Sequence, residues 1–216
     1  YTPQRPMKRA LEQNPVKVEQ WLNDTYPSIS ARAKTEGATI YWGDETAVAE
    51  DGHWLRGSAP AGQTPILAAP SKRHGLSMIS AISNQGLVRF EFIEEAMNTD
   101  LFISFMERLV ADSRQKVFLI LDNLKVHHAK LVTAWLAERK DQIEVFYLPP
   151  YSPEINPDEY LNRDFKTELR SSDRATSKKA LLQKASRFME FLSKTPERVK
   201  AYFNHSAVQY AALQAI

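Results

Sequence analysis

Residues Val117–Asn123 read VFLILDN, five apolar side chains followed by a carboxylate and an amide. An unbroken apolar run of this kind is typical of a strand buried on both faces, as in the parallel part of a sheet. Sheets with parallel strands place their functional sites at the carboxyl ends of those strands. Asp122 therefore stands at a candidate site, although an aspartate here can also act only as a turn or helix cap.

The sequence on either side of this strand predicts an α/β fold. Strands are expected over 38–43, 76–83 and 87–93, the last two joined as an antiparallel hairpin. A helix over 129–139 and a strand over 143–148 follow, and this spacing implies a right-handed parallel crossover. We expect a mixed five-stranded sheet, three antiparallel strands and then two parallel ones, with helices on both faces. Further helices are expected after Asn98, Pro157 and Thr195 and around Leu181–Leu192.

One domain accounts for most of the chain, since 216 residues with 43% hydrophobic content can bury a substantial core. Residues 1–37 are expected to form a helical linker or N-terminal extension, interrupted at Pro27, and residues 38–216 the main domain. Glycine and proline dominate residues 45–75, which predicts a long loop with at most a short strand near 66–69.

Composition excludes several classes of protein. The chain has no cysteine, so any metal must be bound by oxygen or imidazole. Apolar runs stay near five residues, against the roughly 20 needed to cross a bilayer, and no secretory signal is present. A cytoplasmic protein without a membrane partner is the expectation. Residues 160–200 carry eleven Lys and Arg against five Asp and Glu, which fits a surface for a polyanion and, equally well, a solvated helix face.

Two further stretches bring acids toward Asp122. In IYWGDE, residues 40–45, Asp44 and Glu45 are neighbours in an expected strand, so they face opposite sides, and we choose Asp44. The stretch LPPYSPEINPDE, residues 148–159, leaves three acids open for a third role, namely Glu154, Asp158 and Glu159.

Glu159 has a structural interpretation of its own. With Asn156 as the helix cap and Pro157 at the first helical position, Glu159 could simply complete a capping box. Three carboxylates delivered by two strands and a helix would instead suit a pair of hard divalent cations.

Other residues near these acids have two interpretations each. Asn123 and His127 follow Asp122 closely and either begin an exposed helix or serve as a site-orienting or phosphate contact. Trp54 lies in the glycine-rich stretch, where it can be a core residue, a packing anchor or a contact to a partner.

These motifs together resemble the catalytic domain of the mariner superfamily of DDE transposases, most closely its bacterial insertion-sequence branch. The resemblance covers about residues 21–212 and implies an RNase H-like fold. It also implies that Asp44, Asp122 and Glu159 are the catalytic and metal-binding acids. The matching segments are DET at 44–46, Trp54 with GQTP at 62–65, LDN at 121–123 with His127, LPPYSP at 148–153 and NPDE at 156–159.

The resemblance implies a function as well. It predicts phosphodiester hydrolysis at transposon ends and strand transfer into target DNA at a TA dinucleotide, with two Mg²⁺ ions that Mn²⁺ can replace. It also implies double-stranded DNA as partner, a homodimer in which Trp54 contacts the second subunit, and a bacterial, nucleoid-associated location. An RNase H-like nuclease without strand transfer and a non-catalytic DNA-binding or assembly module are the alternatives.

Two departures from the family pattern are visible. The interval between Asp122 and Glu159 holds 36 residues, slightly more than in much of the family. The stretch before Tyr41 is too short for the helix-turn-helix region with which family members recognise the ends of their element.

Overall fold

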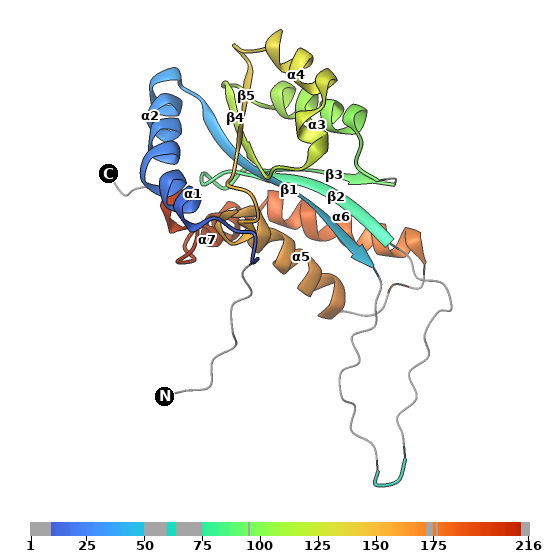
Figure 1. Cartoon of the computed structure of the whole chain (residues 1–216). Helices are drawn as coiled ribbons and strands as arrows, with labels where there is room; N and C mark the ends of the chain where they lie inside the picture. The colour runs from blue at the N-terminus through green and yellow to red at the C-terminus, as the bar shows by residue number, and fades with distance from the viewer. Residues whose placement is uncertain are drawn as a thin grey trace, which may run out of the picture.

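The computed structural model describes residues 10–49, 60–63, 75–94, 96–171, 175 and 177–212. Their strands form one five-stranded sheet in the order β3-β2-β1-β4-β5 (Figure 1). The sheet combines antiparallel and parallel pairing, as the sequence predicted. Its strands are β1 (Thr39–Ala49), β2 (Gly75–Ile82), β3 (Val88–Ile93), β4 (Val117–Leu121) and β5 (Ile143–Tyr147).

The strand pairing confirms the expected topology. β2 pairs antiparallel with both β1 and β3, whereas β4 pairs parallel with both β1 and β5. β4 therefore lies inside the sheet, and every one of its residues is buried. An interior strand with helices on both faces needs an apolar side chain at each position, which explains the unbroken run in its sequence.

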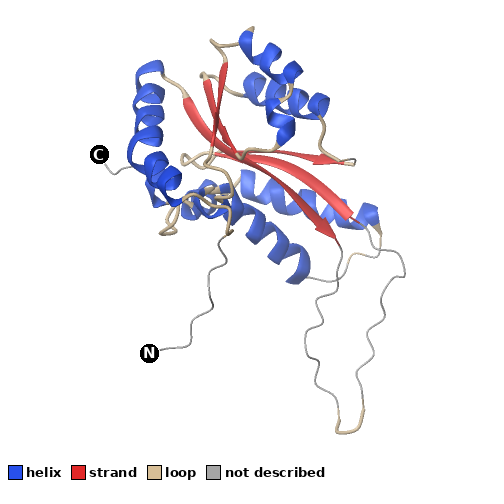
Figure 2. Cartoon of the chain, in the orientation of Figure 1, coloured by secondary structure: helices blue, strands red, loops and turns tan. Residues whose placement is uncertain are grey.

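Helices cover both faces of the sheet (Figures 1 and 2). The first face packs against α3 (Thr99–Asp112) and α4 (Lys130–Ala137). The second face packs against the helices from the two ends of the chain. These are α1 (Pro15–Gln20), α2 (Tyr26–Glu36), α5 (Asp158–Ser171), α6 (Lys178–Ser193) and α7 (Pro196–Tyr202).

Side chains alternate between the two faces along β1. Tyr41 belongs to the core beneath α3 and α4, and Trp42 belongs to the core on the opposite face. Because the period of a strand is two, Asp44 shares the face of Trp42 and Glu45 shares the face of Tyr41. The two neighbouring acids therefore leave the strand in opposite directions.

β1 is longer than the sequence indicated. The strand was expected to end at Gly43, but it pairs with β2 as far as Ala49. Beyond Glu45, Thr46 and Val48 are buried and alternate with exposed Ala47, so β-branched residues extend the ladder. Asp44 consequently lies within the strand rather than at its end. Trp54 and the short strand expected near 66–69 lie outside the described residues.

The N-terminal helices pack against the same core as the sheet. The expected interruption at Pro27 is wrong, since α1 continues through a π-helical turn at Trp21–Thr25 into α2. Pro27 lies just after the π-helical turn, where the regular i→i−4 hydrogen bonds are already interrupted, so the helix accommodates its missing N–H. The ring of Tyr26 lies 6.4 Å from that of Trp21 and 5.9 Å from that of Trp42. Within the described ranges, no helix is long and apolar enough to cross a membrane.

Candidate active site

Three carboxylates from distant parts of the chain line one pocket of about 430 Å³. Asp44 comes from within β1, Asp122 follows the last residue of β4, and Glu159 lies in the first turn of α5. The proline-rich loop at 148–153 forms another wall of the same pocket. The three acids singled out from the sequence are thus brought to one place.

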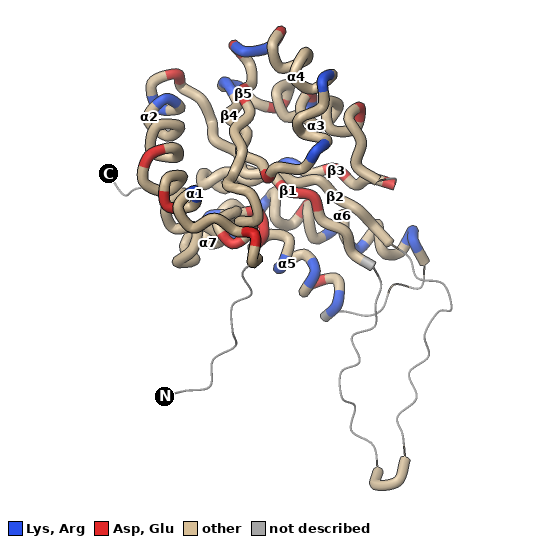
Figure 3. The backbone as a smooth tube through the Cα atoms, viewed as in Figure 1, with Lys and Arg blue, Asp and Glu red and all other residues tan. Residues whose placement is uncertain are grey.

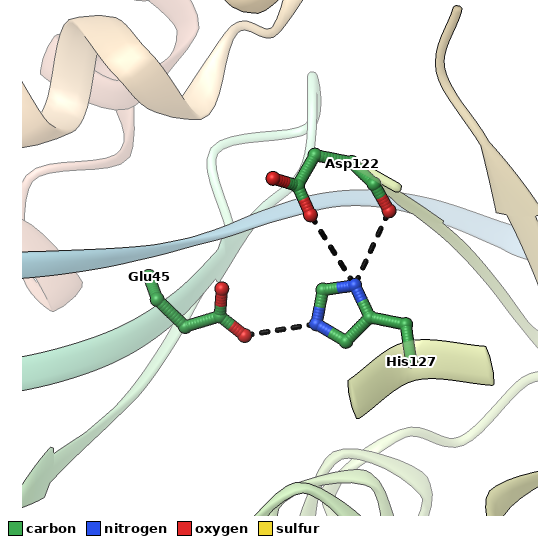
Figure 4. A group of neighbouring side chains, drawn as sticks. All are labelled: Glu45, Asp122 and His127. Atoms are coloured by element: carbon green, nitrogen blue, oxygen red, sulfur yellow. Dashed lines mark hydrogen bonds and ion pairs between the residues drawn. The ribbon is translucent and has the colours of Figure 1, made fainter. Parts of the chain in front are cut away.

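The end of β4 holds Asp122 in a defined turn. Its Oδ1 accepts a hydrogen bond from the backbone N–H of Leu124 at 3.1 Å, so the turn-capping role is present. Its other carboxylate oxygen points away from His127 (Figure 4). Next to it, the side-chain amide of Asn123 donates to the carbonyl of Leu148 and ties the start of the proline loop to β4. Capping and a place in the pocket therefore coexist at Asp122.

The start of α5 does not form a capping box with Glu159. The backbone N–H of Asn156, which such a box would pair with Glu159, donates to the carbonyl of Pro153 at 2.9 Å. The side chain of Asn156 caps the helix instead, accepting from the N–H of Asp158 at 3.1 Å. The same side chain donates to the carbonyl of Gly43 at 3.1 Å, which joins the helix start to β1.

The two other acids of this stretch are occupied elsewhere. Asp158 is buried and accepts a hydrogen bond from the hydroxyl of Ser80 at 2.6 Å. Glu154 accepts a hydrogen bond from Gln13 at 2.6 Å and faces a neighbouring pocket. Of the three acids that the sequence left open, Glu159 is the one that lines the pocket with Asp44 and Asp122.

Repulsion between carboxylates marks the pocket. Burial raises the pKa of Asp44 well above its usual range, and the neighbouring acids, first among them Glu159, raise it further. Burial also raises the pKa of Glu159, against the lowering influence of Lys166 and Arg163. A bound divalent cation would relieve this repulsion, because it supplies positive charge where several hard oxygen donors meet.

Asn162 is a site residue that sequence reasoning missed. Its side-chain amide donates to Oδ2 of Asp44 at 2.9 Å. The available signal was its spacing, since Asn162 lies three residues after Glu159 and residues at i and i+3 share one face of a helix.

His127 connects two acids from opposite sides of its ring. Nε2 lies 2.9 Å from Oε1 of Glu45, and Nδ1 lies 3.2 Å from the carbonyl and 3.3 Å from Oδ1 of Asp122 (Figure 4). Burial opposes the charged imidazole, but the hydrogen bonds to Asp122 and Glu45 raise the pKa of His127 to about 9. The ring is 1% exposed and lies 4.6 Å from that of Phe102, so an exposed helix start is wrong here.

Glu45, Asp122 and His127 also have the spacing of a metal site. Among the residues that the structure describes, they are the one set of three potential ligands whose atoms all lie within 4.8 Å of one another. However, both ring nitrogens of His127 already contact an acid, Nε2 on Glu45 and Nδ1 on Asp122. We therefore interpret this trio as a support that orients Asp122.

Sequence comparison connects the chain to known proteins. Residues 39–182 match the family model described as DDE superfamily endonuclease. Over 98 residues the chain is 35% identical to the insertion element IS630 uncharacterized 39 kDa protein of Shigella sonnei. That alignment covers 44% of this chain and spans only 28% of the length of the relative.

Solved structures share the fold at low sequence identity. The Mos1 transposase paired-end complex with left transposon end matches with a TM-score of 0.66 at 17% identity, over 98% of this chain and 67% of that one. The catalytic domain of Mos1 mariner transposase matches with a TM-score of 0.58 at 16% identity, over 94% and 98% of the two chains. The fold is therefore RNase H-like, as the family resemblance implied.

Proposed function

Because the chain belongs to the DDE superfamily of endonucleases, we propose that it is the catalytic domain of a DNA transposase. The proposed reaction is hydrolysis of phosphodiester bonds at transposon ends, followed by transfer of the freed strand into target DNA. The observation that carries this proposal is the convergence of Asp44, Asp122 and Glu159 on one pocket.

The three acids suit a pair of Mg²⁺ ions, for which Mn²⁺ can substitute. All three offer hard carboxylate oxygens, and burial together with the neighbouring acids raises the pKa of Asp44. Asp44, Asp122 and Glu159 would hold the ions. When bound, such ions activate a water or 3′ hydroxyl nucleophile and neutralise the charge of the leaving oxygen.

The chain's own residues prepare the site for this chemistry. Glu159 would help to position the attacking water or accept its proton. Asn162 would orient Asp44, and His127 with Glu45 would hold Asp122. Since both nitrogens of His127 contact acids, we favour its orienting role over a contact to DNA. Asn123 would fix the proline loop through its bond to Leu148.

A basic stripe on α5 offers a path for the DNA backbone. Arg163, Lys166 and Arg170 follow Glu159 at spacings of four, three and four residues, which places all of them on one side of the helix. Figure 3 shows Lys and Arg along α5. The influence of Lys166 and Arg163 on the pKa of Glu159 supports their closeness to the pocket. Phosphate binding there would make the affinity for DNA fall steeply with salt.

The assembly is part of the proposal. Mos1 has been solved as a paired-end complex and as a Strand Transfer Complex, which supports action on transposon ends and on target DNA. We propose a homodimer in the active complex, with Trp54 contacting the second subunit, a TA target dinucleotide, and a place in the bacterial cytoplasm at the nucleoid. Residues 38–216 would form the catalytic domain and residues 1–37 an N-terminal extension.

Nicking of supercoiled plasmid in Mg²⁺ or Mn²⁺ tests the proposal. Asp122→Asn should abolish nicking while the protein stays folded, because the amide lacks the charge that a divalent cation requires. Asp141→Asn, a change of the same chemistry at an exposed residue, should leave nicking unchanged. Wild-type nicking by Asp122→Asn would refute the assignment.

A second assay separates a transposase from a nuclease. Transposon-end duplexes that already carry a free 3′ hydroxyl are offered together with a plasmid target. A transposase joins the two, whereas an RNase H-like nuclease cleaves DNA without forming joined products. A chain that binds DNA but neither nicks nor joins it would be the non-catalytic module.

A further inference from the structure

The segment just before α1 reaches the wall of the acid pocket through one side chain. The amide nitrogen of Gln13 lies 2.9 Å from the carbonyl of Tyr151, 3.1 Å from Oγ of Ser152 and 2.6 Å from Oε1 of Glu154. The contact to the Glu154 carboxylate is charge-assisted and therefore the strongest kind available to an amide. The two N–H donors of this side chain thus face three acceptors in a loop about 140 residues away.

In the segment just before α1, a polar side chain is buried and an apolar side chain is exposed. Gln13 is 9% exposed, whereas Leu11, two residues earlier, is 99% exposed. A buried glutamine next to an exposed leucine is unusual, because burial normally favours the apolar residue. Hydrogen bonding to the loop, rather than apolar packing, therefore holds this segment in place.

The loop that Gln13 binds needs support from outside. Pro149, Pro150 and Pro153 have no backbone N–H, so the loop has few donors with which to fix itself. Tyr151 adopts a φ of +58°, a left-handed conformation that is unfavourable for a residue with a side chain. The bond from Gln13 to the carbonyl of Tyr151 acts directly on this residue.

We propose that Gln13 is a positioning residue for the active site, holding the proline loop in the shape that confines the DNA strand beside Asp44, Asp122 and Glu159. The inference rests on the proposed function for its catalytic consequence. The loop at 148–153 forms a wall of the pocket, and α5 with Glu159 follows it directly. Loosening this wall would misplace the scissile strand, and small misplacements lower the rate of the chemical step.

Hydrogen exchange tests the contact without DNA or metal. In Gln13→Ala, amides of the peptide covering 148–156 should exchange roughly tenfold faster, as expected for the loss of a charge-assisted hydrogen bond. Gln20→Ala, a matched change at an exposed glutamine of α1, should leave that exchange unchanged. Wild-type exchange in Gln13→Ala would overturn the proposal.

Plasmid nicking tests the catalytic consequence. Gln13→Ala should lower kcat by roughly tenfold with little change in KM, because a misplaced strand still binds. Mn²⁺ affinity, measured by calorimetry, should stay at the wild-type value, since the three acids are intact. An unchanged kcat with faster loop exchange would show that the contact is only structural and would overturn the positioning role.

A charge exchange separates a specific contact from a general loss of packing. Gln13→Glu keeps the size of the side chain but places a carboxylate against Glu154, so loop exchange should be faster and kcat lower than in Gln13→Ala. Adding Glu154→Gln places an N–H donor at position 154, opposite the new carboxylate at position 13. The double variant should therefore recover part of the slow loop exchange and part of kcat. No recovery in the double variant would refute the pairing.

If the wild type does not nick DNA, the proposed function fails, while the exchange measurements still decide whether Gln13 holds the loop.

Discussion

The side-chain amide of Asn162 donates a hydrogen bond to Oδ2 of Asp44 across 2.9 Å, joining α5 to β1 inside the acid pocket. The other oxygen of Asp44, Oδ1, accepts from the backbone N–H of Glu45 at 2.9 Å. Both oxygens of this carboxylate are therefore oriented before any cation binds. Because α5 also carries Glu159, the same helix orients one acid and supplies another.

Asn162→Ala should weaken Mn²⁺ binding and slow plasmid nicking by roughly tenfold each, since a hydrogen bond to a charged group is worth about 1.5–3 kcal/mol. Calorimetry and nicking assays measure the two effects. Asn204→Ala, at an exposed asparagine after α7, serves as the control. Wild-type cation affinity in Asn162→Ala would show that Asp44 does not depend on this amide.

Asp44→Asn should make the metal-free protein more stable while removing its response to metal. The raised pKa of Asp44 means that its ionised form costs stability in the folded state at neutral pH, and asparagine carries no such charge. Without metal, the Tm of Asp44→Asn should be higher than that of the wild type, by about 2–4 °C for each kcal/mol by which the free energy of unfolding increases.

Added Mn²⁺ provides the second half of this test. It should raise the Tm of the wild type, because a ligand that binds only the folded state stabilises it, and it should barely move that of Asp44→Asn. An equal rise of the Tm in both proteins would contradict a role for Asp44 in metal binding.

Gly43→Ala should destabilise the sheet beside the site. A Cβ at Gly43 would lie 2.9 Å from Cδ2 of Leu121 and 3.0 Å from the carbonyl oxygen of Ser80. The second contact is to backbone, so relief requires a shift of β2, and overpacking of this kind costs about 1–3 kcal/mol. Gly75→Ala is the matched control, since its nearest neighbour would be the carbonyl of Val48 at 3.9 Å. Urea unfolding of both variants measures the difference, and equal stabilities would be inconsistent with the close packing at Gly43.

Ionised Asp164 should stabilise the folded state at neutral pH, and this contribution should be lost at low pH. Burial opposes its charge, but hydrogen bonds from Arg198 at 2.8 and 2.9 Å and from Tyr202 at 2.5 Å hold the pKa of Asp164 below its usual value. A lowered pKa stabilises the fold above the unfolded value near 4, and the contribution is lost as pH falls through the folded pKa.

The variant Asp164→Asn isolates this contribution. It should be less stable than the wild type by roughly 1 kcal/mol at pH 7, allowing for solvent screening of this partly exposed pair. The difference should shrink toward pH 3. Urea unfolding at pH 7, 5 and 3 measures it, and a difference that is constant across this range would argue against the ionised pair.

Several elements were predicted correctly from the sequence because residues within the element itself determine them. Asn98 was expected to cap a helix, and its side chain accepts from the N–H of Leu101 at 3.0 Å at the start of α3. The apolar run of β4 predicted a buried strand, since each residue of a strand covered on both faces must be apolar. The length of β1 was underestimated because pairing with β2, a segment some thirty residues later, decides where the strand ends.

By itself, the sequence determined the succession of strands and helices along the chain, the opposite directions of Asp44 and Glu45, and the place of Asp122 after a buried strand. Periodicity and the steric limits of neighbouring residues are enough for these features. Only the tertiary structure decided that Glu159 lines the pocket while Asp158 and Glu154 bind elsewhere, that His127 is buried between two acids, and that Asn162 and Gln13 reach the site. Each of these depends on a hydrogen bond between segments far apart in the chain, and such bonds exist only after the helices have packed onto the sheet.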